Sequence, residues 1–107
     1  MYSYKELYII DFTKAEYYSD IHRIIKEAFD FPEYYGNNSS ALWDCLTDML
    51  GRSINIRILG FDTLENNFKS TADSIKDVFL RLKNYDNGKY TKDVNVTLCY
   101  KDKETKL

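Results

Sequence analysis

Two short segments, far apart in the chain, alternate strictly between apolar and polar residues. Residues 54–59 read INIRIL, and residues 94–100 read VNVTLCY. A period of two residues predicts strands that bury one face and leave the other at least partly in water. Such strands favour a two-layer fold, in which helices cover one side of a sheet, over a sheet covered on both faces.

The remaining pattern predicts one more strand and four helices. An apolar run over residues 7–12 predicts a strand, and Thr13 with Glu16 forms a capping box that should begin a helix ending near Phe29. Later helices are expected from about residue 39 to Gly51, over 61–68, and from about residue 70 to 86–88. Strands separated by helices pair in parallel through right-handed crossovers. The predicted class is α/β, with a three-stranded parallel sheet packed against about four helices.

The length and composition fit one small soluble domain. We place it over residues 1–100, and we expect residues 101–107, KDKETKL, to be a frayed charged tail because they carry no apolar pattern. The first residues lack a basic stretch followed by an apolar one, and no apolar run approaches the roughly 18 residues that cross a bilayer. Neither of the two cysteines lies in a C-x-x-C pair. We therefore expect reduced thiols and a cytoplasmic location.

The net charge of −2 is modest, but the acidic residues are unevenly distributed. Residues 27–51 contain no Lys, Arg or His and carry five acids: Glu27, Asp30, Glu33, Asp44 and Asp48. This block should repel the phosphates of nucleic acids and attract a cationic partner. We expect neither nucleic acid nor a membrane to be the partner.

The sequence offers little for catalysis or for a cofactor. His22 is the only histidine, and Cys45 is the one thiol that could pair with it. Cys45 falls on the same helical face as Leu42 and Leu46, so a buried inert thiol is the favoured interpretation. There is no phosphate-binding glycine loop and no Cys/His cluster with zinc spacing. Asp44 and Asp48 are spaced to share a cation, but a solvated helix face is the ordinary explanation. We predict no catalytic residue, cofactor or metal.

The segment FPEYYGNNSSALWDCLTD, residues 31–48, indicates a surface that binds another protein. Gly36 is free to take a positive φ, which Asn37 or Asn38 also tolerates, and Asn38, Ser39 or Ser40 should cap the helix that follows. On that helix Asp44 should point away from the core, with Trp43 at the border of the exposed arc. An acid beside aromatic side chains is typical of interface hot spots; the alternative is a core-packing tryptophan on an ordinary wet face.

Within this segment, PEYYGNN followed by ALWDCLT resembles the barstar family, small intracellular inhibitors of secreted microbial ribonucleases. The resemblance continues without gaps to about Lys83. It implies that the loop and helix enter the ribonuclease cleft and that Asp44 occupies the phosphate site. The contact residues predicted from pattern and resemblance together are Tyr34, Tyr35, Gly36, Asn38, Ser40, Trp43, Asp44, Thr47 and Asp48.

Three positions depart from the family pattern. Ser40 and Arg81 stand where the family usually has acids, and Met49 replaces an aromatic residue. We expect a one-to-one complex with a basic, extracellular-type ribonuclease, formed by a chain that is monomeric when free. The alternative is a module of the same fold that binds another cationic protein without inhibiting a ribonuclease.

Overall fold

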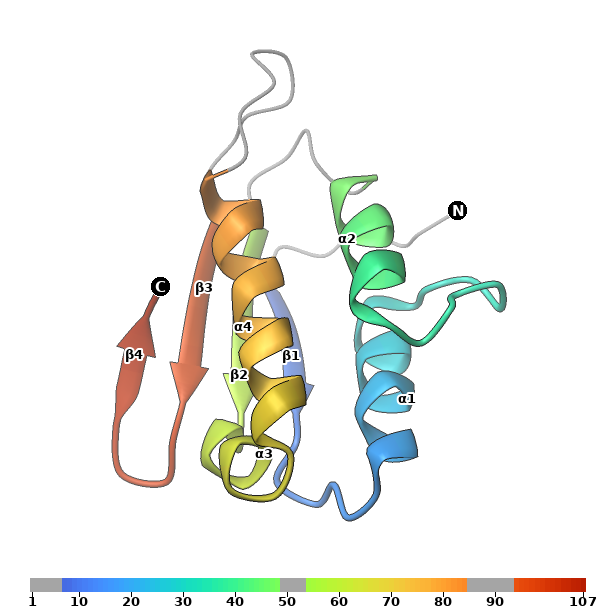
Figure 1. Ribbon diagram of the computed structural model, residues 1–107. Helices are drawn as coiled ribbons and strands as arrows, with labels where there is room; N and C mark the ends of the chain where they lie inside the picture. The colour runs from blue at the N-terminus through green and yellow to red at the C-terminus, as the bar shows by residue number, and fades with distance from the viewer. Residues whose placement is uncertain (1–6, 49–53, 85–93) are drawn as a thin grey trace.

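The computed structural model describes residues 7–48, 54–84 and 94–107, and it contains a four-stranded sheet (Figure 1). The strands are β1 (Leu7–Asp11), β2 (Ile54–Leu59), β3 (Val94–Cys99) and β4 (Glu104–Lys106), arranged in the order β1-β2-β3-β4. The first three pair in parallel, and β4 is antiparallel to β3. The predicted parallel three-stranded core is confirmed, and β4 extends it.

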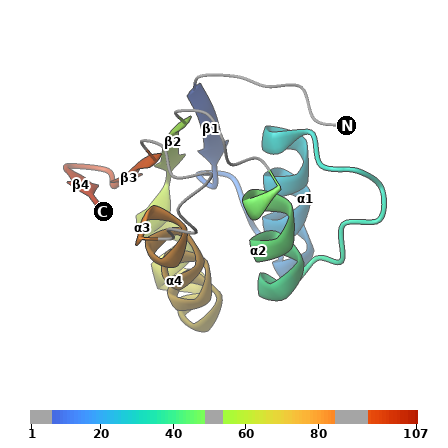
Figure 2. The same ribbon diagram turned by 90° about the horizontal axis from the view of Figure 1, so that it is seen from above.

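In the part of the chain that the structure describes, four helices form the second layer. They are α1 (Tyr18–Phe29), α2 (Ser39–Thr47), α3 (Phe61–Asn67) and α4 (Lys69–Asn84). Viewed from above, all four lie on one side of the sheet (Figure 2). Ile54, Ile56 and Ile58 of β2 are buried beneath them, whereas Asn55 is exposed on the other face. The two-layer prediction from strand alternation is confirmed, and within the described ranges no helix is long and apolar enough to cross a membrane.

The predicted frayed tail is wrong, because residues 104–106 form β4. Leu107 donates its backbone N–H to the carbonyl of Val96 at 2.9 Å, and Tyr100 donates to Lys103 across the turn at 2.8 Å. Arg57 of β2 also forms an ion pair with Glu104. All three β4 side chains are exposed, so backbone hydrogen bonds rather than burial hold this strand. A strand of this kind needs no apolar pattern, so the side-chain pattern did not predict it.

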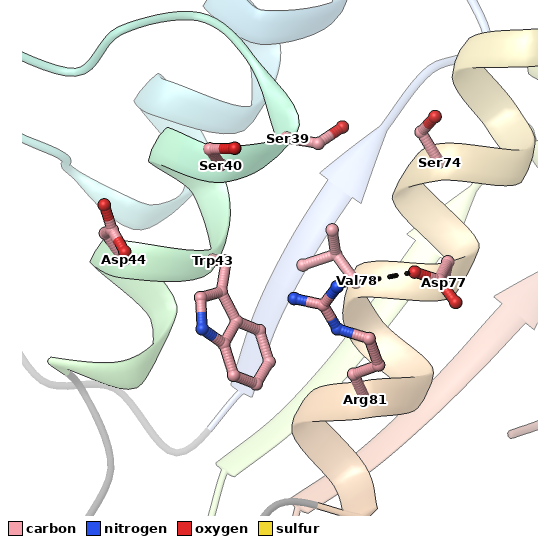
Figure 3. A pocket seen from close by; sticks show the side chains of 8 residues that line it. All are labelled: Ser39, Ser40, Trp43, Asp44, Ser74, Asp77, Val78 and Arg81. Carbon is pink, nitrogen blue, oxygen red and sulfur yellow. Dashed lines mark ion pairs between the residues drawn. The ribbon is translucent and has the colours of Figure 1, made fainter.

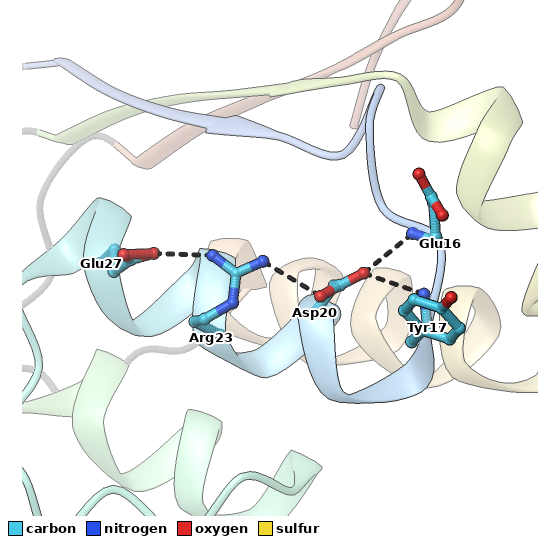
Figure 4. Close-up of polar contacts among 5 residues, drawn as sticks. All are labelled: Glu16, Tyr17, Asp20, Arg23 and Glu27. Atoms are coloured by element: carbon cyan, nitrogen blue, oxygen red, sulfur yellow. Dashed lines mark hydrogen bonds and ion pairs between the residues drawn. The ribbon is translucent and has the colours of Figure 1, made fainter.

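The predicted start of α1 is also wrong. The backbone N–H and hydroxyl of Thr13 both donate to the carboxylate of Asp11, at 2.9 and 2.6 Å, so Thr13 belongs to a turn after β1. The helix begins at Tyr18 instead, where Asp20 accepts from the N–H groups of Glu16 and Tyr17, each at 2.9 Å (Figure 4). These bonds lower the pKa of the Asp20 carboxyl. Asp20 therefore accepts from the N–H of Glu16, which the predicted capping box had paired with Thr13.

Candidate functional site

Helix α2 presents an acidic side chain from a firmly anchored backbone. Leu42, Cys45 and Leu46 are buried against the core, at 0, 6 and 1% exposure, while Asp44 and Ser40 are exposed on the opposite side. The predicted wheel is confirmed over these positions. Met49 and Gly51, predicted for the end of this helix, lie outside the described residues.

The turn into α2 is fixed by Asn38. Its side-chain oxygen accepts from the N–H of Ala41 at 2.8 Å, and its amide donates to the carbonyl of Gly36 at 3.1 Å. The predicted cap is therefore Asn38, one of the three candidates. Of the three residues expected to accept a positive φ, Asn37 takes it, at 57°. Gly36 serves a different need, since an added Cβ would lie only 3.3 Å from the Cβ of Ala41.

The two adjacent tyrosines have different surroundings. Tyr34 is 79% exposed, whereas Tyr35 is 5% exposed and lies 5.2 Å from Phe31 between ring centroids. Phe31 in turn stacks on Phe29 of α1 at 5.1 Å. Tyr35 therefore offers almost none of its side chain to a partner: its ring is part of the aromatic core that holds the loop, and Tyr34 is the ring left at the surface.

Tyr35 is also joined to α1 by a buried polar contact. Its hydroxyl oxygen lies 2.7 Å from Nδ1 of His22, which is itself buried. Burial lowers the pKa of His22 and raises that of Tyr35, so the imidazole is neutral and the phenol protonated at neutral pH. A hydroxyl that donates to a neutral Nδ1 fits both shifts. This contact ties the loop before α2 to the middle of α1.

The same contact bears on the alternative of a Cys45–His22 catalytic pair. Nδ1 of His22 is engaged by Tyr35, and Cys45 is buried, so a substrate has little access to its sulfur. The expectation of a buried thiol at this position is confirmed.

One acid of the block at residues 27–51 is paired with a lysine that lies just outside the block. Lys26 of α1 forms an ion pair with Glu33 at 3.0 Å, across the turn at the end of α1. The hydroxyl of Thr47 donates to the backbone carbonyl of Asp44 at 2.9 Å. Asp48 is exposed and caps the end of α2.

Among the described residues, no group of three or more His, Cys, Asp or Glu is placed to hold a metal ion.

Trp43 lies between α2 and α4 and borders a groove of about 290 Å³ (Figure 3). The groove is lined by Ser39, Ser40, Trp43 and Asp44 from α2, and by Ser74, Asp77, Val78 and Arg81 from α4. The Arg81 guanidinium carbon lies 4.5 Å from the centroid of the Trp43 ring. Trp43 is half-buried, which confirms its predicted position at the border between the buried and exposed sides of the helix.

Sequence reasoning missed the α4 wall of this groove apart from Arg81. Ser74, Asp77 and Arg81 follow the three- and four-residue spacing of one helix face, which adjoins the buried stripe at Val78. That spacing was a usable signal. It does not reveal which other element the face lies beside, and α2 supplies the second wall only through the packing of α2 against α4.

Two comparisons with known proteins agree with the earlier resemblance. The model of a family described as Barstar (barnase inhibitor) matches residues 6–99. A protein of Bacillus subtilis (strain 168) named "Putative ribonuclease inhibitor YrdF" is 36% identical over 70 residues, which cover 65% of this chain and 77% of that protein.

Proposed function

The chain belongs to the barstar family, and from that premise we propose that it inhibits a basic microbial ribonuclease by blocking the active site with its α2 surface. The observation that carries the proposal is the placement of Asp44. Its carboxylate is exposed on a helix whose other side is buried and whose start is capped by Asn38. Exposed Tyr34 lies in the loop just before this helix.

The proposed mechanism is mimicry of a phosphate group. An enzyme that cleaves RNA must hold phosphates with cationic groups, and arginine binds carboxylate and phosphate with the same paired hydrogen bonds. Asp44 offers two anionic oxygens from a fixed position, so it would occupy a phosphate site without being cleaved. No chemistry is required of the inhibitor.

Rigidity of the loop and helix supports this mechanism. Binding costs less free energy when the contact residues are already held in their bound arrangement. Asn38 fixes the first turn of α2, and the buried Tyr35 ring fixes the loop that carries Tyr34. Tyr35 thus contributes to the surface indirectly, through position rather than contact.

The proposal includes one-to-one binding and action inside the producing cell. Both cysteines are free and buried, which fits a reducing compartment but does not require one. The uneven charge would also speed encounter with a basic enzyme, since residues 27–51 carry no cationic side chain.

The test is inhibition of RNA cleavage by a panel of purified basic microbial ribonucleases, barnase among them. Asp44→Ala should raise the inhibition constant for the most strongly inhibited enzyme at least tenfold, because it leaves desolvated cationic groups unpaired. Asp62→Ala in α3, away from the α2–α4 groove, removes the same charge and should change the constant less than twofold.

Two results would refute the proposal in different ways. If Asp44→Ala inhibits as well as the parent, the phosphate-mimic role is wrong. If the parent binds an enzyme of the panel in calorimetry with a dependence on Asp44, but RNA cleavage continues, the protein is a binding module for a cationic partner and not an inhibitor.

A further inference from the structure

Arg81 is a cation fixed inside the surface that is otherwise suited to a cationic partner. Its guanidinium lies over Trp43 at 4.5 Å, and its side chain remains 54% exposed (Figure 3). Asp77 is its ion-pair partner on α4, but the separation of 3.8 Å exceeds hydrogen-bond distance. The contact with the indole holds the guanidinium in place, and because the side chain is half-exposed its N–H donors can reach a partner.

This arrangement conflicts with a uniformly cationic partner surface. An active site that binds RNA is lined by positive groups because its substrate is a polyanion. Asp44 on the α2 wall fits such a surface, whereas Arg81 on the α4 wall of the same groove would be repelled by it. Asp77 offsets Arg81 only weakly, since exposed pairs at this separation contribute little.

We propose that Arg81 determines which ribonuclease is inhibited, by pairing with a carboxylate at the rim of the partner's active site. The inference rests on the proposed function and adds to it the chemistry of the partner. A guanidinium held over the Trp43 ring presents the paired donors that a carboxylate accepts. The same residue repels any ribonuclease that has a cation at that place. Arg81 would therefore raise the affinity for the correct partner and lower the affinity for others.

The groove fits this assignment in size and lining. Its volume of about 290 Å³ is enough for a partner side chain to enter between α2 and α4. The hydroxyls of Ser39, Ser40 and Ser74 line it and can donate to a partner carboxylate. Asp44 and Asp77 line it too and would repel one, so the carboxylate must approach on the Arg81 side of the groove.

The experiment uses the full chain and the same ribonuclease panel, and it follows the enzyme that the parent inhibits most strongly. Arg81→Gln should raise the inhibition constant about tenfold, and Arg81→Glu should raise it further, because attraction becomes repulsion. Lys83→Glu makes the same change in net charge two residues along α4. A step of two residues turns about 200° around a helix, so Lys83 faces away from the groove and its variant should leave the constant within twofold of the parent.

A second readout excludes a merely structural effect. Replacing the partner's rim carboxylate by arginine should restore inhibition by Arg81→Glu while weakening inhibition by the parent. Circular dichroism and thermal unfolding should show the Arg81 variants folded, since the side chain is half-exposed.

The possible results separate this inference from the proposed function. Inhibition that depends on Asp44 but is unchanged or improved by Arg81→Glu overturns the role of Arg81 and leaves the proposed function standing. If the parent inhibits no enzyme of the panel, both are overturned. If Lys83→Glu weakens inhibition as much as Arg81→Glu, the effect is one of net charge, and the assignment to the groove is wrong.

Discussion

Tyr35→Phe tests whether the loop before α2 is held by the buried contact between Tyr35 and His22. The substitution removes only the hydroxyl, which lies 2.7 Å from Nδ1 of a histidine that is 5% exposed. The ring remains, so its packing on Phe31 is kept. What is lost is one buried hydrogen bond, and the imidazole nitrogen loses this partner.

A buried polar group that loses its hydrogen bond costs about 1–3 kcal/mol. With a loss of about 2 kcal/mol and a urea slope of about 2 kcal/mol per molar, the unfolding midpoint should fall by about 1 M. In a thermal scan, the loss corresponds to roughly 8–16 °C for a domain near this size. Urea unfolding followed by tryptophan fluorescence is a suitable assay, because the single tryptophan, Trp43, lies on the helix that the loop leads into.

Tyr34→Phe is the matched control, since the same atom is removed from the adjacent residue. Tyr34 is 79% exposed, so its variant should unfold within about 0.5 kcal/mol of the parent. The reasoning is refuted if Tyr35→Phe unfolds at the parent's midpoint, or if the two variants lose the same free energy. Either result would mean that the hydroxyl of Tyr35 has no special partner.

Three more outcomes are expected from the same measurements. Burial lowers the pKa of His22, so below about pH 6.5 the unfolded chain binds a proton more readily than the folded chain. The free energy of unfolding should therefore fall as the pH is lowered from about 6.5, by up to about 1.4 kcal/mol per pH unit. A flat profile between about pH 6.5 and 5.5 would contradict this. Asn38→Ala should cost about 1 kcal/mol of unfolding free energy by removing the cap of α2. Asn38→Asp should cost less, because it keeps the acceptor for the Ala41 N–H and loses only the donor to Gly36; equal losses would show that the capping acceptor contributes nothing. Deletion of residues 104–107 should lower the thermal midpoint, because β3 loses its paired neighbour and the core loses its contact with Leu107. An unchanged midpoint would support the frayed tail first expected.

Local periodicity was enough to predict the scaffold. The predicted bounds of β2 match the structure, because side chains of a strand alternate between its two faces and the isoleucines of INIRIL all fall on the buried face. The buried stripe of α4 matched for the same reason at helical spacing, with Ile75, Val78, Phe79 and Leu82 all buried. The outward position of Asp44 followed from the apolar residues around it on the same helix.

The sequence alone therefore determined the layers, the strand faces and the side of α2 that carries Asp44, because each of these depends on neighbours along one element. Tertiary structure decided which of two adjacent tyrosines is buried, since Tyr35 finds its partner on α1 and Tyr34 finds none in the core. It also decided the environment of Trp43, which meets Arg81 only where α2 packs against α4. Strand β4 likewise depends on backbone bonds to a strand that precedes it by only a turn, and side-chain pattern does not record such bonds.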